Sequence, residues 1–119
     1  GVSILTSLNA EQTKKFYFNN DIENIVSKFT NYALTNQLDG VVCSPKEIKI
    51  IKKIALNKLL IITPGIRPSN YNNCNDDQKR IMTPKEAIEA GSDYLVIGRP
   101  ITQSSSPLET LKSINSSLD

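Results

Sequence analysis

The chain has 119 residues, a formal net charge of +2 and 22% charged residues, an ordinary composition for one small domain. This balance gives no case for binding nucleic acid or a membrane through bulk charge, and no apolar run is long enough to span a bilayer. Histidine is absent, which excludes histidine-dependent nucleophilic catalysis and histidine-ligated metal sites within the chain. Two cysteines, Cys43 and Cys74, are too few for a disulfide framework, and reduced thiols fit a cytoplasmic protein.

The first third of the chain predicts a strand, a helix and a second strand. Residues 2–6 are an apolar, strand-like run, and the polar residues 9–17 are compatible with a short helix. Residues 21–35 carry apolar side chains at helical spacing, and Asn20, three residues before Glu23, is the expected N-cap. A turn at Leu38-Asp39-Gly40 then leads into a strand at residues 41–43, which Cys43 ends as a small core residue.

A four-residue pattern recurs at the expected start of each later helix. A hydroxyl residue is followed by proline and, three positions on, by glutamate, which is a capping box with proline at the first helical position. The pattern predicts helices at residues 46–56, 85–90 and 108–118, and Gly91 is a good stop for the middle one. The three copies are Ser44-Pro45-Lys46-Glu47, Thr83-Pro84-Lys85-Glu86 and Ser106-Pro107-Leu108-Glu109.

Two apolar runs, residues 59–62 and 94–97, are bounded by turn residues and predict fully buried strands. Each is followed by a loop with glycine, arginine and proline: residues 63–68 after the first, and Gly98-Arg99-Pro100 after the second. Glycine lets a backbone approach a ligand closely, and the planar guanidinium matches an anion. Two such loops on neighbouring parallel strands predict a phosphate site at the carboxyl edge of a sheet, as after the last two strands of a (β/α)₈ barrel.

The elements alternate strand and helix four times, which favours a parallel α/β fold. A complete (β/α)₈ barrel takes about 250 residues, so we expect the four units to be strands 5–8 of such a TIM barrel, part of a single domain. The chain begins at Gly1 without an initiator methionine, which fits a fragment lacking its amino-terminal half.

Five blocks, in order and at suitable spacing, resemble the carboxy-terminal half of the orotidine 5′-phosphate decarboxylase family. They are Leu5-Thr6-Ser7, DGVVCS at residues 39–44, TPGIRP at residues 63–68, Asp77-Gln78 followed by RIMTP at residues 80–84, and AGSDYLVIGRPITQ at residues 90–103. A single glycine-arginine pair would be weak evidence, whereas five ordered blocks spanning nearly the whole chain are specific. The family converts orotidine 5′-monophosphate to UMP and CO₂ without a cofactor, so the resemblance implies a homodimeric enzyme of pyrimidine biosynthesis.

The resemblance also implies a substrate site at Thr6, Arg67, Gln78, Gly98 and Arg99. Gly98 and Arg99, with Arg67, would hold the phosphate; Gln78 would reach over the ligand, and Thr6 would recognise the pyrimidine amide. Each has a plainer interpretation: Arg99 as an exposed loop arginine, Arg67 as an anchor for the following loop, Gln78 as a solvated residue and Thr6 as a β-branched strand residue. Residues 66–82 form a long polar loop, and such loops are either disordered or functional lids.

The chain departs from the family at its catalytic centre. The Asp-x-Lys-x-x-Asp array, whose lysine lies beside the developing carbanion, is absent, and Lys46, Lys49, Lys52 and Lys53 follow a helical pattern typical of a solvated face. We therefore expect no catalytic residue here and no decarboxylase activity from the chain alone. Two alternatives stay open: a non-catalytic module that binds a phosphate ligand, and another phosphate-binding barrel lyase.

Overall fold

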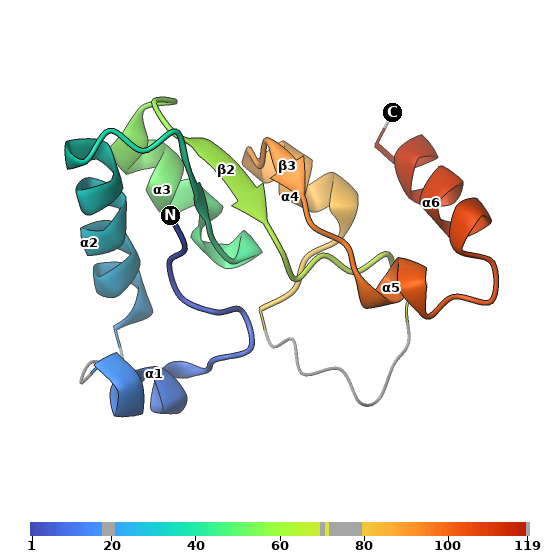
Figure 1. Ribbon diagram of the computed structural model, residues 1–119, viewed down its shortest axis with the longest axis horizontal. Helices are drawn as coiled ribbons and strands as arrows, with labels where there is room; N and C mark the ends of the chain where they lie inside the picture. The colour runs from blue at the N-terminus through green and yellow to red at the C-terminus, as the bar shows by residue number, and fades with distance from the viewer. Residues whose placement is uncertain (18–20, 70, 72–79, 119) are drawn as a thin grey trace.

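The computed structural model describes residues 1–17, 21–69, 71 and 80–118. Strands and helices alternate along most of this part of the chain, as the sequence predicts (Figure 1). The elements in chain order are α1 (Ala10–Tyr17), α2 (Ile22–Thr35), β1 (Gly40–Val42), the 3-10 helix η1 (Pro45–Glu47), α3 (Ile48–Ala55), β2 (Leu60–Thr63), α4 (Pro84–Ala90), β3 (Tyr94–Leu95), α5 (Arg99–Thr102) and α6 (Pro107–Ser116).

The three strands form one parallel sheet in the order β1-β2-β3. Gly40 is paired with Leu60, and Ile62 with Tyr94, so each strand lies beside the next one along the chain. Parallel neighbours require a crossover between them, and the helices of the intervening segments supply it. The predicted parallel α/β arrangement is confirmed for these strands.

The predicted strand at residues 2–6 is wrong as an extended element. Only Val2 forms a bridge, parallel to Val42, and Ser3 N–H donates to the Val42 carbonyl at 3.0 Å. Beyond Ser3 the segment leaves the sheet, and the carbonyls of Ile4 and Leu5 accept hydrogen bonds from the guanidinium of Arg80 instead. The segment keeps the parallel direction and lies next to β1, but a side chain replaces the backbone ladder.

Two of the three predicted capping boxes are present. Ser44 and Thr83 each cap their helix, and in each case the glutamate three residues on accepts the N–H of the capping residue. The third prediction is wrong, because the Ser106 side chain forms no capping hydrogen bond with the part of the chain that the structure describes. For α2 the observed N-cap is Asp21, which accepts from Asn24 N–H at 3.0 Å; the predicted cap, Asn20, lies outside the described residues.

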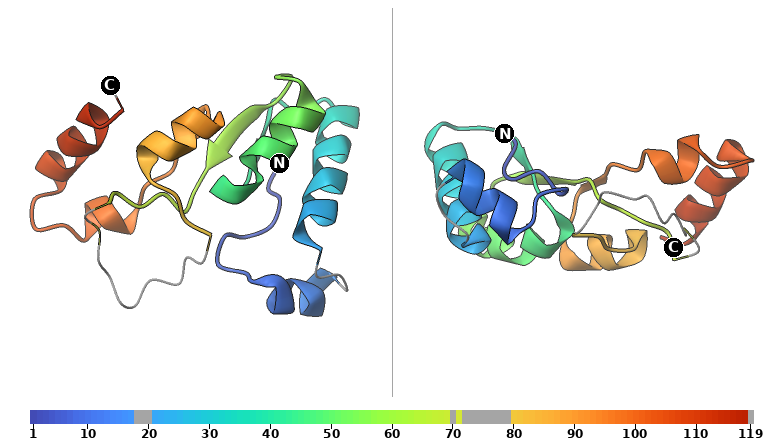
Figure 2. Two further views of the ribbon diagram at one scale, coloured as in Figure 1. Left: turned by 180° about the vertical axis from the view of Figure 1, so that it is seen from behind. Right: turned by 90° about the horizontal axis from the view of Figure 1, so that it is seen from below.

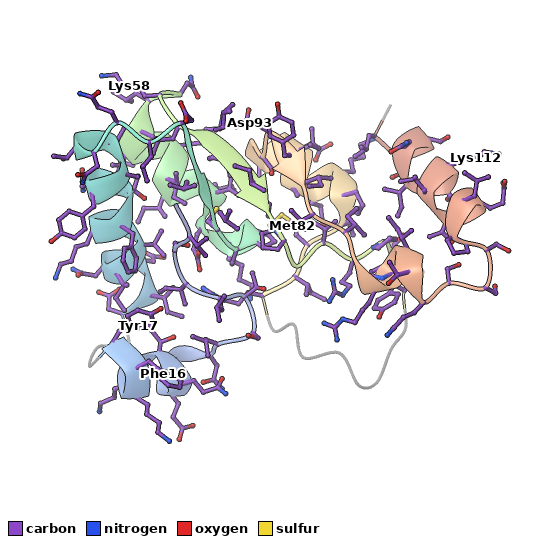
Figure 3. The ribbon with its side chains drawn as sticks, viewed as in Figure 1. Phe16, Tyr17, Lys58, Met82, Asp93 and Lys112 are labelled. Atoms are coloured by element: carbon purple, nitrogen blue, oxygen red, sulfur yellow. The ribbon has the colours of Figure 1, made fainter. Side chains whose placement is uncertain are left out.

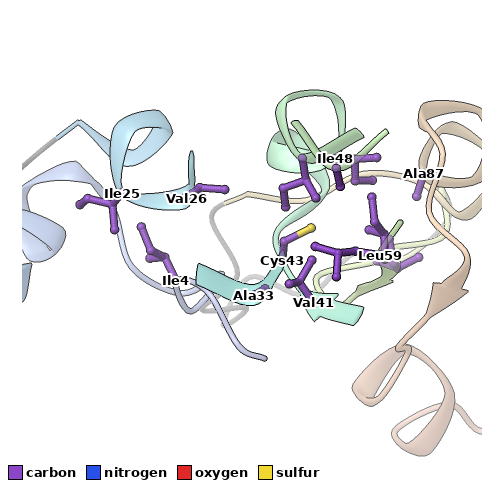
Figure 4. Close-up of a cluster of buried hydrophobic side chains, with 13 residues drawn as sticks. Ile4, Ile25, Val26, Ala33, Val41, Cys43, Ile48, Leu59 and Ala87 are labelled. Atoms are coloured by element: carbon purple, nitrogen blue, oxygen red, sulfur yellow. The ribbon is translucent and has the colours of Figure 1, made fainter. Parts of the chain in front are cut away.

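The core lies between one face of the sheet and the helices α2, α3 and α4, which cover that face (Figure 2). Val41, Cys43 and Ile61 are the buried residues that β1, its end and β2 contribute to this core. Ile48 of α3 and Ala87 of α4 pack against them (Figure 4). The alternation of side chains along each strand explains why Gly40, Val42 and Leu60 lie on the opposite face.

That opposite face is apolar and exposed. Leu60, Tyr94 and Val96 are 46%, 60% and 49% exposed, so the expectation of two fully buried strands is wrong. The sequence pattern correctly indicates strands that are apolar on both faces, but the described residues cover only one of them. None of the described helices is long and apolar enough to cross a membrane.

Candidate anion site at the carboxyl edge of the sheet

A hollow of about 180 Å³ lies where β2 and β3 end. It brings together residues from three segments that are far apart in the sequence: the amino-terminal segment, the loop after β2 and the loop after β3. Four of the five residues predicted for the substrate site line it. Its lining residues are Thr6, Pro64, Gly65, Arg67, Val96, Gly98 and Arg99.

The loop after β2 is held by backbone hydrogen bonds to Met82. Arg67 N–H donates to the Met82 carbonyl at 2.9 Å, and Met82 N–H donates to the Gly65 carbonyl at 3.4 Å. Met82 lies near the middle of the molecule, next to the segment that follows β2 (Figure 3). Gly65 has φ of 78°, a left-handed conformation that favours glycine, so this position explains why the loop carries one.

The Arg67 side chain is buried and positioned. Its Nη1 donates to the Ile66 carbonyl at 2.9 Å, and the centre of the guanidinium lies 5.4 Å from the centroid of the Tyr71 ring. A guanidinium held over an aromatic ring in this way has few alternative rotamers. Arg67 is held within its loop and also lines the hollow, so its position is compatible with both interpretations.

Gly98 and Arg99 form the opposite wall. The Gly98 carbonyl accepts from the N–H groups of Ile101 and Thr102 at 2.9 and 3.0 Å, and these bonds turn the chain into α5. A methyl group added at Gly98 would meet no described atom within 4 Å, so the backbone here borders open space. Arg99, half-buried, follows directly and completes this wall.

Thr6 reaches the hollow from the first segment of the chain, where its side chain is buried. It is not a strand residue, which removes the plainer interpretation offered for it above. Gln78 and Cys74 lie outside the described residues, so the structure does not place the predicted contact from Gln78.

The hollow is suited to an anion. Two arginines line it, and no acidic side chain is among its described lining residues. Guanidinium groups offer several N–H donors in a plane, which match the oxygens of a phosphate or carboxylate. Larger hollows elsewhere lack this feature: one of about 690 Å³ beside α4 and α6 has Lys85 and Glu109 on its walls, and one of about 250 Å³ beside α2 is mainly apolar.

Arg80 is a buried residue of the block at residues 80–84 that was not among the predicted site residues. Its guanidinium pairs with Glu47 and donates to the carbonyls of Ile4 and Leu5 at 3.3 and 2.7 Å. Burial lowers the pKa of Arg80, an effect that the nearby Cys43 thiolate would oppose. Glu47 is 33 residues away, so no local pattern distinguishes Arg80 from its neighbour Lys79.

The structure also locates the lysines that could have supplied a catalytic ammonium. Lys46, Lys49 and Lys53 are exposed and Lys52 is half-buried, which confirms the solvated face expected of them. No cluster of three or more possible metal ligands occurs within the described ranges.

Comparison with known proteins identifies close relatives. A sequence profile of the orotidine 5′-phosphate decarboxylase / HUMPS family matches residues 1–114. A protein from Coxiella burnetii (strain RSA 331 / Henzerling II) named orotidine 5′-phosphate decarboxylase is 47% identical over 115 residues, covering 97% of this chain and 48% of the relative. A protein of the same name from Actinobacillus pleuropneumoniae serotype 5b (strain L20) is 46% identical, covering 98% and 50% respectively.

Solved structures agree. The chain is similar to orotidine 5′-phosphate decarboxylase from Lactobacillus acidophilus, with a TM-score of 0.76 and 32% identity over 99% of this chain and 47% of that one. It is also similar to the enzyme of that name from Pyrococcus horikoshii OT3, with a TM-score of 0.62 and 25% identity over 82% and 43%. The chain thus spans about half the length of the relatives it matches. It belongs to the orotidine 5′-phosphate decarboxylase / HUMPS family.

Proposed function

We propose that this chain is the carboxy-terminal half of a single TIM-barrel domain in an orotidine 5′-phosphate decarboxylase. The intact, homodimeric enzyme converts orotidine 5′-monophosphate to UMP and CO₂: the bond between the ring carbon and the carboxylate breaks, and a proton takes its place. This half supplies the groups that hold the nucleotide, with Arg99, Gly98 and Arg67 at the phosphate and Thr6 at the pyrimidine. Gln78 is the further ligand contact that we propose.

The observation that carries the proposal is the convergence of Thr6, Arg67, Gly98 and Arg99 on one hollow. The four come from segments up to 93 positions apart, and the parallel sheet brings the loops after β2 and β3 together at one edge. A site of this kind, at the carboxyl edge of the last strands, is where TIM barrels bind phosphate. Binding energy gained at a phosphate can assist a reaction at a distant carbon by ordering the site.

The exposed apolar face of the sheet supports the assignment to half a barrel. Leu60, Tyr94 and Val96 would face the interior of a closed barrel, where the remaining strands would cover them. The chain also lacks the lysine–aspartate array that stabilises the carbanion in this family. We therefore assign the proton-donating groups to the other half of the enzyme.

The test is UMP formation from orotidine 5′-monophosphate by the purified chain, alone and mixed with the remaining half of the Coxiella burnetii relative. We expect no turnover above the uncatalysed rate from the chain alone, and measurable turnover from the mixture. Turnover by the chain alone would contradict the assignment of the catalytic groups to the other half.

The purified chain and the mixture also distinguish the proposed function from the two alternatives. A non-catalytic module would bind UMP yet remain inactive in every mixture with a competent partner half. Another phosphate-binding lyase would prefer a sugar phosphate, so ribose 5-phosphate would bind at least as tightly as UMP. The proposal requires tighter binding of UMP, because the Thr6 side of the hollow recognises the base.

A further inference from the structure

Arg80 joins segments that are far apart in the sequence. One Nη atom pairs with a Glu47 carboxylate oxygen, and the other donates to the carbonyls of Ile4 and Leu5. The side chain is only 9% exposed, and the carboxylate that it meets is buried as well. A buried guanidinium with a paired carboxylate and two carbonyl acceptors has one defined position, since moving it would leave a charge unpaired.

The carbonyls that Arg80 holds lead directly to the hollow. Ile4 and Leu5 are the two residues before Thr6, and the backbone bonds between this segment and the sheet stop at Ser3. Thr6 therefore stands at the end of a segment held by the buried Ile4 side chain and by Arg80 rather than by a strand ladder. The Leu8 N–H bond to the Leu5 carbonyl then turns the chain away from the sheet.

Arg80 is also tied to the other side of the hollow. Two residues along the chain, Met82 forms the backbone bonds that hold Gly65 and Arg67. Glu47 uses its other oxygen to accept Ser44 N–H at the end of β1. Arg80 thus connects the segment of Ile4 and Leu5 with the end of β1 through Glu47, and with the loop after β2 through the nearby Met82.

We propose that Arg80 is a positioning residue that holds Thr6 at its correct distance from Gly65 and Arg67 across the hollow. It does not line the hollow, and it acts on the ligand through Thr6. This inference rests on the proposed function, because Thr6 is taken there as the contact to the pyrimidine.

A double-mutant cycle on UMP binding tests the proposal in the full-length protein to which the proposed function assigns this chain. Arg80→Met keeps the bulk of the side chain and removes its donors. We expect it to weaken UMP binding about tenfold when Thr6 is intact and less than about twofold in the Thr6→Ala background, since residues coupled through a shared backbone shift show interaction energies of this order. In the double variant of Arg80→Met and Arg99→Ala, the two fold-losses of UMP affinity should multiply, because the two substitutions act independently. A general loss of stability would not be selective for Thr6, so equal effects in both backgrounds would overturn the proposal.

Glu47→Gln and Glu86→Gln provide a matched pair. Both glutamates close a capping box, but only Glu47 contacts Arg80. Glu47→Gln should show the same coupling to Thr6, and Glu86→Gln none. Glu47→Gln takes the place of Arg80→Met if that variant does not fold.

Amide chemical shifts in the absence of UMP give a readout that does not depend on function. Arg80→Met should move the Thr6 signal, and Lys53→Ala, which changes an exposed residue of α3, should not. If the wild type does not bind UMP but Arg80→Met still shifts the Thr6 signal, the proposed function is refuted and the positioning role of Arg80 is not. If Arg80→Met leaves the Thr6 signal unchanged, the positioning role is refuted.

Discussion

The helix starts at Ser44 and Thr83 follow the same local rule in different surroundings. Each has proline at the first helical position and a glutamate that accepts the N–H of the capping residue, at 3.1 Å for Glu47 and 2.9 Å for Glu86. Glu47 is 3% exposed and its remaining oxygen pairs with Arg80, whereas Glu86 lies at the surface and accepts the Thr83 hydroxyl at 2.6 Å. The local sequence decides where a helix begins, and the position in the fold decides what else the glutamate does.

The largest expected effect comes from removing the buried glutamate. Glu47→Ala leaves the guanidinium of Arg80 buried without its carboxylate, so we expect it to lower the free energy of unfolding by about 3–5 kcal/mol. Glu86→Ala should have a much smaller effect, because its carboxylate is solvated. Guanidinium chloride unfolding of the two variants in the same protein measures the difference. Equal losses would mean that burial adds nothing to the shared capping rule.

The reactivity of the Cys43 thiol measures how well the region around the Ser44–Glu47 capping box is buried. Burial raises the pKa of Cys43 from 9.0 to about 12, and Arg80 opposes this only in part. Because the thiolate is the nucleophile, a rise of about three pH units lowers its population near pH 8 about a thousandfold. With Cys74→Ser leaving Cys43 as the single thiol, iodoacetamide should modify the folded protein at least that much more slowly than the denatured protein. Similar rates in the two states would show that this region is open.

A smaller difference in stability is expected between the second and third copies of the pattern, at Thr83 and Ser106. Thr83→Ala should destabilise by about 1 kcal/mol through loss of the N-cap, as is usual for such caps. Ser106→Ala should have almost no effect, because no capping bond from Ser106 is present within the described part of the chain. Thermal unfolding of the two variants is sufficient for this comparison. A clear destabilisation by Ser106→Ala would indicate that the third box does form in solution.

The smallest expected effect is a change in the pKa of Glu86, in the exposed capping box of Thr83 and Glu86. Hydrogen bonds from the Thr83 side chain and backbone lower the pKa of Glu86. Since the folded carboxylate then binds its proton less readily, the associated stabilisation is complete above the ordinary glutamate pKa and disappears as pH falls through the lowered one. Thr83→Val should move the Glu86 pKa upwards in an NMR titration. An unchanged titration curve would contradict a role for the hydroxyl.

Local patterns were sufficient for most of the fold. Proline and glutamate after a hydroxyl residue located η1 and α4, and Gly91 ended α4 with φ of 107°. The pattern failed at residues 2–6, because an apolar run does not reveal whether a backbone ladder or the Arg80 side chain will satisfy its carbonyls. It also failed at Tyr94 and Val96, because burial depends on what covers a strand.

The sequence predicted the candidate site only in part, because local patterns place some of its residues but not the contacts that position them. Glycine and arginine directly after predicted strands place Arg67, Gly98 and Arg99 at one edge of a parallel sheet, so their meeting could be expected. The link between Arg80 and Glu47 could not, since it joins positions 33 residues apart and the capping pattern around Glu47 does not indicate a partner for its second oxygen. Long-range ion pairs of this kind become visible only once the sheet has set the distance between loops.

The most direct test of the account is whether Arg99 holds a phosphate. In the full-length protein, calorimetry with UMP and with uridine should show that Arg99→Ala weakens UMP binding by about 1.5–3 kcal/mol, the range for hydrogen bonds to a charged group. Uridine binding should be unchanged, and Lys53→Ala, which removes an exposed cation from α3, should alter neither affinity. An equal loss of affinity for UMP and uridine in the Arg99→Ala variant would contradict the account, because Arg99 would then not be the group that contacts the phosphate.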